Sequence, residues 1–71
     1  MVRRREVIRT ISRAAEVAGV EWKLDREGAN HSVFRLGPTM IPIPRHAEID
    51  RRLAEMIFKE CEAELGRRWW M

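Results

Sequence analysis

Apolar residues return every three or four positions near the start of the chain and gather on one face of residues 4–18: Val7, Ile8, Ile11, Ala14, Ala15 and Ala18. A rotation of about 100° per residue predicts an amphipathic helix. Arginines at every fourth position occupy the opposite face, and Gly19 follows as a residue type that commonly ends helices. The chain is therefore expected to begin with a helix that buries one side.

Residue 20 begins a different pattern, because apolar and charged positions now alternate around Trp22 and Leu24. Alternation of this kind is typical of a half-buried strand. Turn-forming residues divide the middle of the chain into three predicted strands, over about 20–26, 31–36 and 39–43. Pro42 cannot donate a hydrogen bond to a neighbouring strand, so the third strand is expected at a sheet edge.

The helical period resumes over about 51–65, where a broad apolar stripe contains Leu53, Met56, Ile57, Cys61 and Leu65. Asp50 precedes this segment and is a favourable N-cap residue. Residues 66–71 remain as a tail that carries two large apolar side chains, Trp69 and Trp70. Three roles are open for the tail: packing back on the helices, which we expect first, docking to another protein, or stacking on unpaired bases.

Together these segments predict a single α+β domain over residues 1–71, in the order helix, three antiparallel strands, helix. Each helix has one apolar side to bury, so both helices are expected to pack on the same face of the sheet. The opposite face is then uncovered. His31 and Arg35 are expected to project from it, because alternate residues of a strand point to opposite faces.

Composition adds an electrostatic argument. Fourteen Lys and Arg residues, most of them arginine, stand against eleven Asp and Glu, which gives a net charge of +3. The planar guanidinium of arginine suits phosphate, so nucleic acid is a favoured partner, although the same arginines could simply balance neighbouring acids. A chain of 71 residues has little room to enclose a small metabolite, which favours a large substrate lying across the surface.

The sequence also excludes some classes of protein. Cys61 is the only cysteine, which excludes an internal disulfide and a thiolate metal cluster. The two histidines match no zinc-ligand spacing, and no carboxylate cluster suggests a two-metal nuclease, so no metal and no cofactor are expected. Because no apolar leader and no membrane-length apolar run is visible, we expect a cytoplasmic protein.

Two histidines are the candidate catalytic groups. RNA carries its own nucleophile, the 2′-hydroxyl, so a protein that cleaves it needs a proton acceptor or donor and positive charge near the phosphate. Histidine, with an unperturbed pKa of about 6.5, exchanges protons near neutral pH. His31, directly after a glycine-containing turn, is the main candidate, and its alternative role is only to hydrogen-bond that turn. His46 is an auxiliary candidate, for which a structural hydrogen bond in its loop is the first expectation.

Four basic residues on or near the uncovered face are expected to contact RNA phosphates: Lys23, Arg26, Arg35 and Arg45. The arginine run at residues 3–5 is a second basic group that could follow the RNA backbone. Ordinary solvation at the protein surface is the alternative for each of these residues.

Two short motifs occur in a specific order. Gly-Ala-Asn-His at residues 28–31 leads into the second predicted strand, and Ile-Pro-Ile-Pro-Arg-His at residues 41–46 covers the end of the third. The first resembles the Gly-(Gly/Ala)-(Ser/Asn)-His motif, and the second the Pro-Arg-His motif, of the HicA (YcfA-like) family of toxin–antitoxin ribonucleases. The resemblance extends over residues 4–65.

This resemblance implies a fold like that of the double-stranded RNA-binding domain and the activity of an mRNA interferase, an endoribonuclease toxin. The chemistry of RNA cleavage by a histidine leads separately to the hypothesis of metal-independent transesterification, with His31 as general base or acid. The resemblance places the family's essential histidine at His31. It also implies a HicB-like antitoxin as partner, with oligomerisation through that antitoxin. From the residues alone, two other functions remain open: a non-catalytic RNA-binding module of the same fold, and an interaction domain that uses the tryptophan tail.

Overall fold

The order of elements expected from the sequence is present in the computed structural model, which describes all 71 residues. The main elements are α1 (Arg4–Ala18), β2 (Trp22–Glu27), β3 (His31–Leu36), β4 (Thr39–Pro44) and α2 (Arg51–Glu60). The predicted limits of α1 and β3 are confirmed to the residue, whereas β2 begins at Trp22 rather than at residue 20. None of the helices combines the length and the apolar character needed to cross a lipid bilayer.

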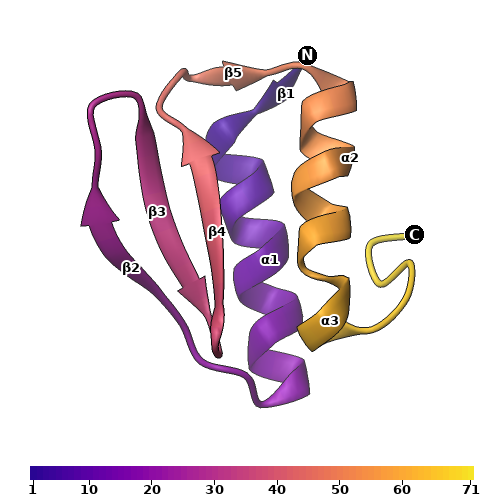
Figure 1. Cartoon of the computed structure of the whole chain (residues 1–71). Helices are drawn as coiled ribbons and strands as arrows, with labels where there is room; N and C mark the ends of the chain where they lie inside the picture. The colour runs from indigo at the N-terminus through magenta and orange to yellow at the C-terminus, as the bar shows by residue number, and fades with distance from the viewer.

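The sheet is antiparallel with the strand order β2-β3-β4, so β4 is an edge strand, as Pro42 predicts. A second, two-stranded ribbon joins β1 (Val2–Arg3) to β5 (Glu48–Ile49). The sequence indicated only a connection between the sheet and the second helix, and this interpretation was wrong for β5. The ribbon holds the start of α1 beside the segment that precedes α2 (Figure 1).

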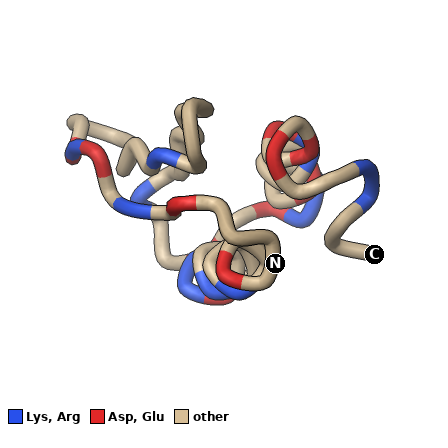
Figure 2. Tube along the Cα trace, turned by 90° about the horizontal axis from the view of Figure 1, so that it is seen from below, with Lys and Arg blue, Asp and Glu red and all other residues tan.

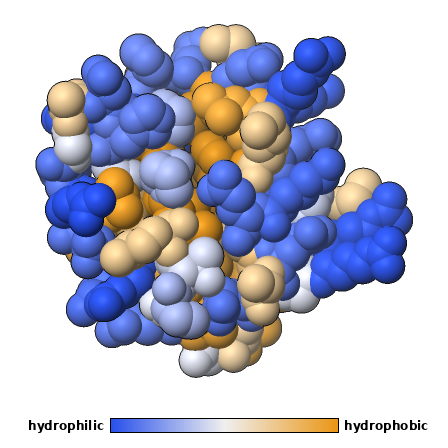
Figure 3. Space-filling view, in the orientation of Figure 1, coloured by the Kyte–Doolittle hydropathy of each residue, from blue (hydrophilic) through white to orange (hydrophobic).

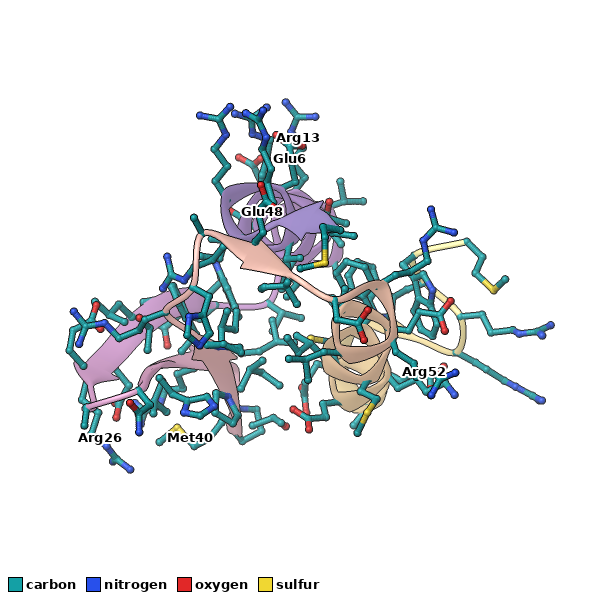
Figure 4. All side chains as sticks on the ribbon, turned by 90° about the horizontal axis from the view of Figure 1, so that it is seen from above. Glu6, Arg13, Arg26, Met40, Glu48 and Arg52 are labelled. Carbon is teal, nitrogen blue, oxygen red and sulfur yellow. The ribbon has the colours of Figure 1, made fainter.

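The two helices occupy different places relative to the sheet. α1 lies across one face of the sheet, whereas α2 lies beside the edge strand β4 and roughly level with the sheet (Figures 1 and 4). The expectation that both helices share one face of the sheet is therefore correct only for α1. Because α1 is placed against both the sheet and α2, a single apolar core forms between the three, and the opposite face of the sheet stays uncovered.

The core draws on every main element except β2. Its ten buried residues are Val7, Ile11, Ala15, Leu36, Ile41, Ile43, Ile49, Ala54, Ile57 and Cys61. Three members of the apolar stripe predicted for the second helix lie outside these ten residues: Leu65 is half-buried against them, whereas Met56 is 57% and Leu53 is 37% exposed. The prediction was wrong here because α1, β4 and the tail cover other parts of α2, and the part of its stripe that carries Met56 and Leu53 faces solvent.

The second helix is also shorter than the sequence pattern indicated. It is interrupted at Cys61, after which a short helix α3 (Glu62–Leu65) follows. Asp50 stands at the N-cap position as expected, but its side chain makes no capping hydrogen bond. Gly19 ends α1 in the left-handed conformation that its sequence position predicted, with φ of 72°.

The tail packs back on α2. The indole Nε1 of Trp69 donates a hydrogen bond of 2.8 Å to the backbone carbonyl of Phe58, and the two rings meet edge to face at 5.2 Å. Trp70 lies 5.9 Å from Trp69 in a similar arrangement. The first of the three roles considered for the tail is therefore the one the structure has, because the contact covers aromatic surface that would otherwise face water.

The thiol of Cys61 provides a test of the core. Burial, and secondarily the charge of Glu60, raises the pKa of this thiol from the ordinary 9.0 to about 12. Below pH 9.0 the thiol is neutral in both the folded and the unfolded chain, so its full contribution to the free energy of unfolding is present at those pH values. Above pH 9.0 only the unfolded chain ionises, and the free energy of unfolding should fall by about 1.4 kcal/mol per pH unit until about pH 12.

Urea denaturation of the wild type and of Cys61→Ala across this pH window measures the effect. The variant should lack the part of the slope that the thiol supplies, while other titrating groups act equally on both proteins. Parallel slopes in the two proteins would contradict a buried, neutral thiol.

Candidate nucleic-acid interface

The uncovered face of the sheet is built by the alternation of β3. Ser32 and Leu36 are buried toward α1, so the alternate residues His31, Val33 and Arg35 point to the opposite side. Arg26 and Met40 also project from the side of the sheet that faces away from α1 (Figure 4). The view onto this side shows mainly hydrophilic residues over β2 and β3, and a hydrophobic strip between the sheet and α2 (Figure 3).

His31 is the first residue of β3 and is exposed. It stands opposite Pro44 in the β3–β4 register. Its imidazole makes no hydrogen bond with the rest of the chain. The alternative in which this side chain only hydrogen-bonds the preceding turn is therefore not what the structure has, and both ring nitrogens are free to meet a ligand.

Gly28 supports the turn that precedes His31. Its N–H donates a hydrogen bond of 2.7 Å to the carbonyl oxygen of His31. A Cβ at this position would lie 3.1 Å from that same oxygen, which is closer than almost all real contacts of this kind. The absence of a Cβ therefore eases this close approach, and neither Gly28 nor Asn30 adopts a positive φ.

Two cations face each other across the middle of the open face. Lys23 of β2 is the direct register partner of Arg35 of β3. Lys23 has one weak ion pair, 3.9 Å from Glu21, and Arg35 has no carboxylate within 4 Å. Like charges directly opposite in a sheet are destabilising, so this arrangement favours an anion between them.

Arg26 reaches the same face because of an irregularity in β2. Strict alternation from Trp22 and Leu24, which lie on the α1 side, would turn Arg26 inward. The β2–β3 register shifts between Leu24 and Arg26, and Arg26 pairs with the outward residue Val33. Its guanidinium lies 3.8 Å from Asp25, at 70% exposure, so this ion pair leaves it accessible.

Arg45, the fourth predicted phosphate contact, lies just after β4 and is tied to the β2–β3 turn. Its Nη1 donates a hydrogen bond of 2.9 Å to the carbonyl of Gly28, and its backbone N–H donates one of 3.2 Å to the carbonyl of Asn30. Its Nε also forms an ion pair of 3.7 Å with Glu27. The structure therefore gives Arg45 a role in holding the turn beside His31, in addition to any contact with RNA.

A polar network on the inner side of the sheet was not predicted from the sequence. Arg4 donates from Nη2 to Ser32 Oγ at 2.6 Å and from Nε to the carbonyl of Pro44 at 2.8 Å. The hydroxyl of Ser32 in turn donates a hydrogen bond of 2.8 Å to the carboxylate of Glu27. The network fixes both neighbours of His31 in the sheet, Ser32 along the strand and Pro44 across it. A polar residue at an inward position of β3 was the one available signal, and its partner 28 residues away could not be inferred from the sequence.

His46 is exposed in the bend that follows β4, and its side chain makes no hydrogen bond. The structural role expected first for this residue therefore has no support in the structure. No group of three or more His, Cys, Asp or Glu residues is arranged to hold a metal ion.

Charge is spread over the whole molecule and is not concentrated on one side. Lys and Arg occur on α1, on the sheet, on α2 and in the tail, interspersed with Asp and Glu (Figure 2). Only four ion pairs of 4 Å or less form: Arg9–Glu6, Lys23–Glu21, Arg26–Asp25 and Arg45–Glu27. Most arginines are thus not balanced by an adjacent acid.

These features define an α+β domain with a helix behind an antiparallel sheet and an open sheet face that carries a free imidazole among basic side chains. Comparisons with protein-family models, with curated proteins and with solved structures found no match.

Proposed function

We propose that this protein is an endoribonuclease toxin of the HicA type, which cleaves RNA without a metal ion and uses His31 as its general acid or base. The observation that carries the proposal is the position of one exposed imidazole on an uncovered sheet face that also holds Lys23, Arg26 and Arg35. The resemblance of residues 28–31 and 41–46 to the HicA motifs supports the same function.

The proposed chemistry is transesterification within the RNA. The 2′-oxygen of a ribose attacks the adjacent phosphorus, a new P–O2′ bond forms, and the P–O5′ bond breaks. A base accepts the proton of the 2′-hydroxyl, and an acid donates a proton to the departing 5′-oxygen. His31 performs one of these transfers, and Lys23 and Arg35 hold the non-bridging phosphate oxygens as charge develops on them. His46 is the candidate for the other transfer, since it too is exposed and not hydrogen-bonded.

An antitoxin of the HicB type is the proposed protein partner. It would inhibit by covering His31 and the basic side chains around it, and an acidic surface would complement them. Co-expression of the neighbouring reading frame with this chain, followed by growth measurement, tests that part of the proposal.

The test of the function is cleavage of a single-stranded RNA in a buffer that contains a metal chelator. We expect cleavage to continue, with fragments that end in a 2′,3′-cyclic phosphate and a 5′-hydroxyl, because the nucleophile is the substrate's own 2′-oxygen. A DNA oligonucleotide of the same sequence lacks that oxygen and should remain intact. Mass spectrometry of the fragments distinguishes these end groups.

Two outcomes would count against the proposal. Loss of cleavage in the chelator would indicate a metal-dependent enzyme. RNA binding without cleavage under all conditions would favour the alternative, a non-catalytic RNA-binding module that uses the same basic face.

A further inference from the structure

A cleft with a volume of about 440 Å³ opens at the end of the sheet where α1 begins. The size lies within the range of roughly 300–1,000 Å³ that is usual for ligand pockets. Six residues line it: Arg3, Arg4, Arg5, Arg45, Ala47 and Glu48. Four guanidinium groups and a single carboxylate make this cleft strongly basic.

The arginines of the cleft divide into two kinds. Arg4 is half-buried, and its guanidinium already donates to Ser32 and to Pro44. Arg3 and Arg5 are exposed, donate no side-chain hydrogen bond and have no carboxylate within 4 Å. The structural interactions of the chain therefore leave two complete guanidinium groups, with five N–H donors each, available in the cleft.

The cleft adjoins the surroundings of His31. Arg45 belongs to its wall, and the backbone N–H of Arg45 bonds to Asn30, the residue before His31. Arg4 belongs to its wall and bonds to Ser32, the residue after His31. The β2–β3 turn, the end of β4 and the start of α1 all lie at the same end of the molecule (Figure 1).

We infer that the cleft is a second phosphate-binding subsite for the RNA, in which Arg3 and Arg5 hold a backbone phosphate a short distance along the strand from the one at His31. The inference rests on the proposed ribonuclease function and adds the path of the substrate. The strand crosses the open sheet face, passes Arg45 at the corner, and continues over the end of the sheet into the cleft. Fork-shaped guanidinium donors in a concave site suit a phosphodiester.

The inference makes substrate length a measurable variable. An oligonucleotide too short to reach the cleft contacts only the sheet face, so it cannot gain from Arg3 and Arg5. A longer strand binds both sites, and its KM should be lower while kcat stays the same, because the subsite acts on binding and not on the reacting atoms.

The test compares a double variant, Arg3→Gln with Arg5→Gln, with a matched control, Arg67→Gln with Arg68→Gln. Both variants remove two positive charges from exposed positions, and the control lies in the tail, away from the cleft. Arg4 is left unchanged because it supports the strand that carries His31. For the double variant we expect KM for a long RNA to rise roughly ten-fold, with kcat and the cleavage of a dinucleotide unchanged. The control should keep the wild-type values.

Equilibrium binding of a single-stranded oligonucleotide separates this inference from the proposed function. The slope of log affinity against log salt should become shallower by about 0.7 in the double variant, which corresponds to the loss of one neutralised phosphate in single-stranded nucleic acid. If the wild type cleaves no RNA, the proposed function fails, and this slope still tests the cleft. An unchanged slope and KM, or equal changes in the control, would overturn the inference even where cleavage is intact.

Discussion

Replacement of His31 by alanine is expected to lower the rate of RNA cleavage by roughly 10²–10⁴-fold, the range that a positioned general acid or base contributes. The ring is exposed and makes no hydrogen bond within the chain, so its loss removes proton transfer without removing a structural contact. The free energy of unfolding should change by about 0.5 kcal/mol or less, as is usual at such surface sites. Single-turnover cleavage of a labelled RNA measures the rate.

His46→Gln is the matched comparison for this experiment. It removes the other exposed imidazole at the same end of the sheet, and circular dichroism verifies the fold of both variants. Affinity for RNA should stay near the wild-type value in His31→Ala, since the arginine side chains remain. A folded His31→Ala protein that cleaves at the wild-type rate would remove His31 from the mechanism. A slow His46→Gln protein would assign it the second proton transfer.

Replacement of Ile11 by alanine should lower the free energy of unfolding by about 2–5 kcal/mol. Ile11 is fully buried at the centre of the apolar side of α1, and the smaller side chain leaves a cavity where the helix packs on the rest of the core. A domain of 71 residues has a total stability of roughly 4–11 kcal/mol. The loss is therefore a large part of the total, and the melting temperature should fall markedly.

Val17→Ala on the same helix is the control. Val17 is 90% exposed, so truncation there creates no cavity and should change stability by about 0.5 kcal/mol or less. Urea denaturation followed by circular dichroism measures both variants. A similar, small effect in the two proteins would show that α1 does not pack against the sheet and α2 through Ile11.

The position of His31 on the open face follows from local pattern. A strand that begins at residue 31 and contains Phe34 and Leu36 on its apolar side must place His31 and Arg35 on the other. The same reasoning predicted β4 as an edge strand from Pro42, and the structure confirms it. The resemblance to HicA proteins supplied the expectation of catalysis, and that expectation stays a prediction.

Arg26 shows where local pattern is insufficient. Alternation from Trp22 would turn it toward α1, and only the irregular register between Leu24 and Arg26 brings it to the open face. Whether a strand contains such a bulge depends on how it pairs with its neighbour. The apolar stripe of the second helix is a similar case, because Met56 is exposed by the position that α2 takes beside β4.

The sequence by itself determined the first helix, the three strands of the main sheet, the presence of a second helix and their order. It also determined the limits of α1 and β3 and the outward direction of His31, because each depends on residues a few positions apart. Tertiary structure alone decided the β1–β5 ribbon, the place of α2 and the surroundings of His31. Arg4 meets Ser32 and Pro44 across separations of 28 and 40 residues, and the same residue lines the arginine cleft where the start of α1 lies at the end of the sheet. Interactions over such separations depend on the packing of the whole core, which no local period in the sequence specifies.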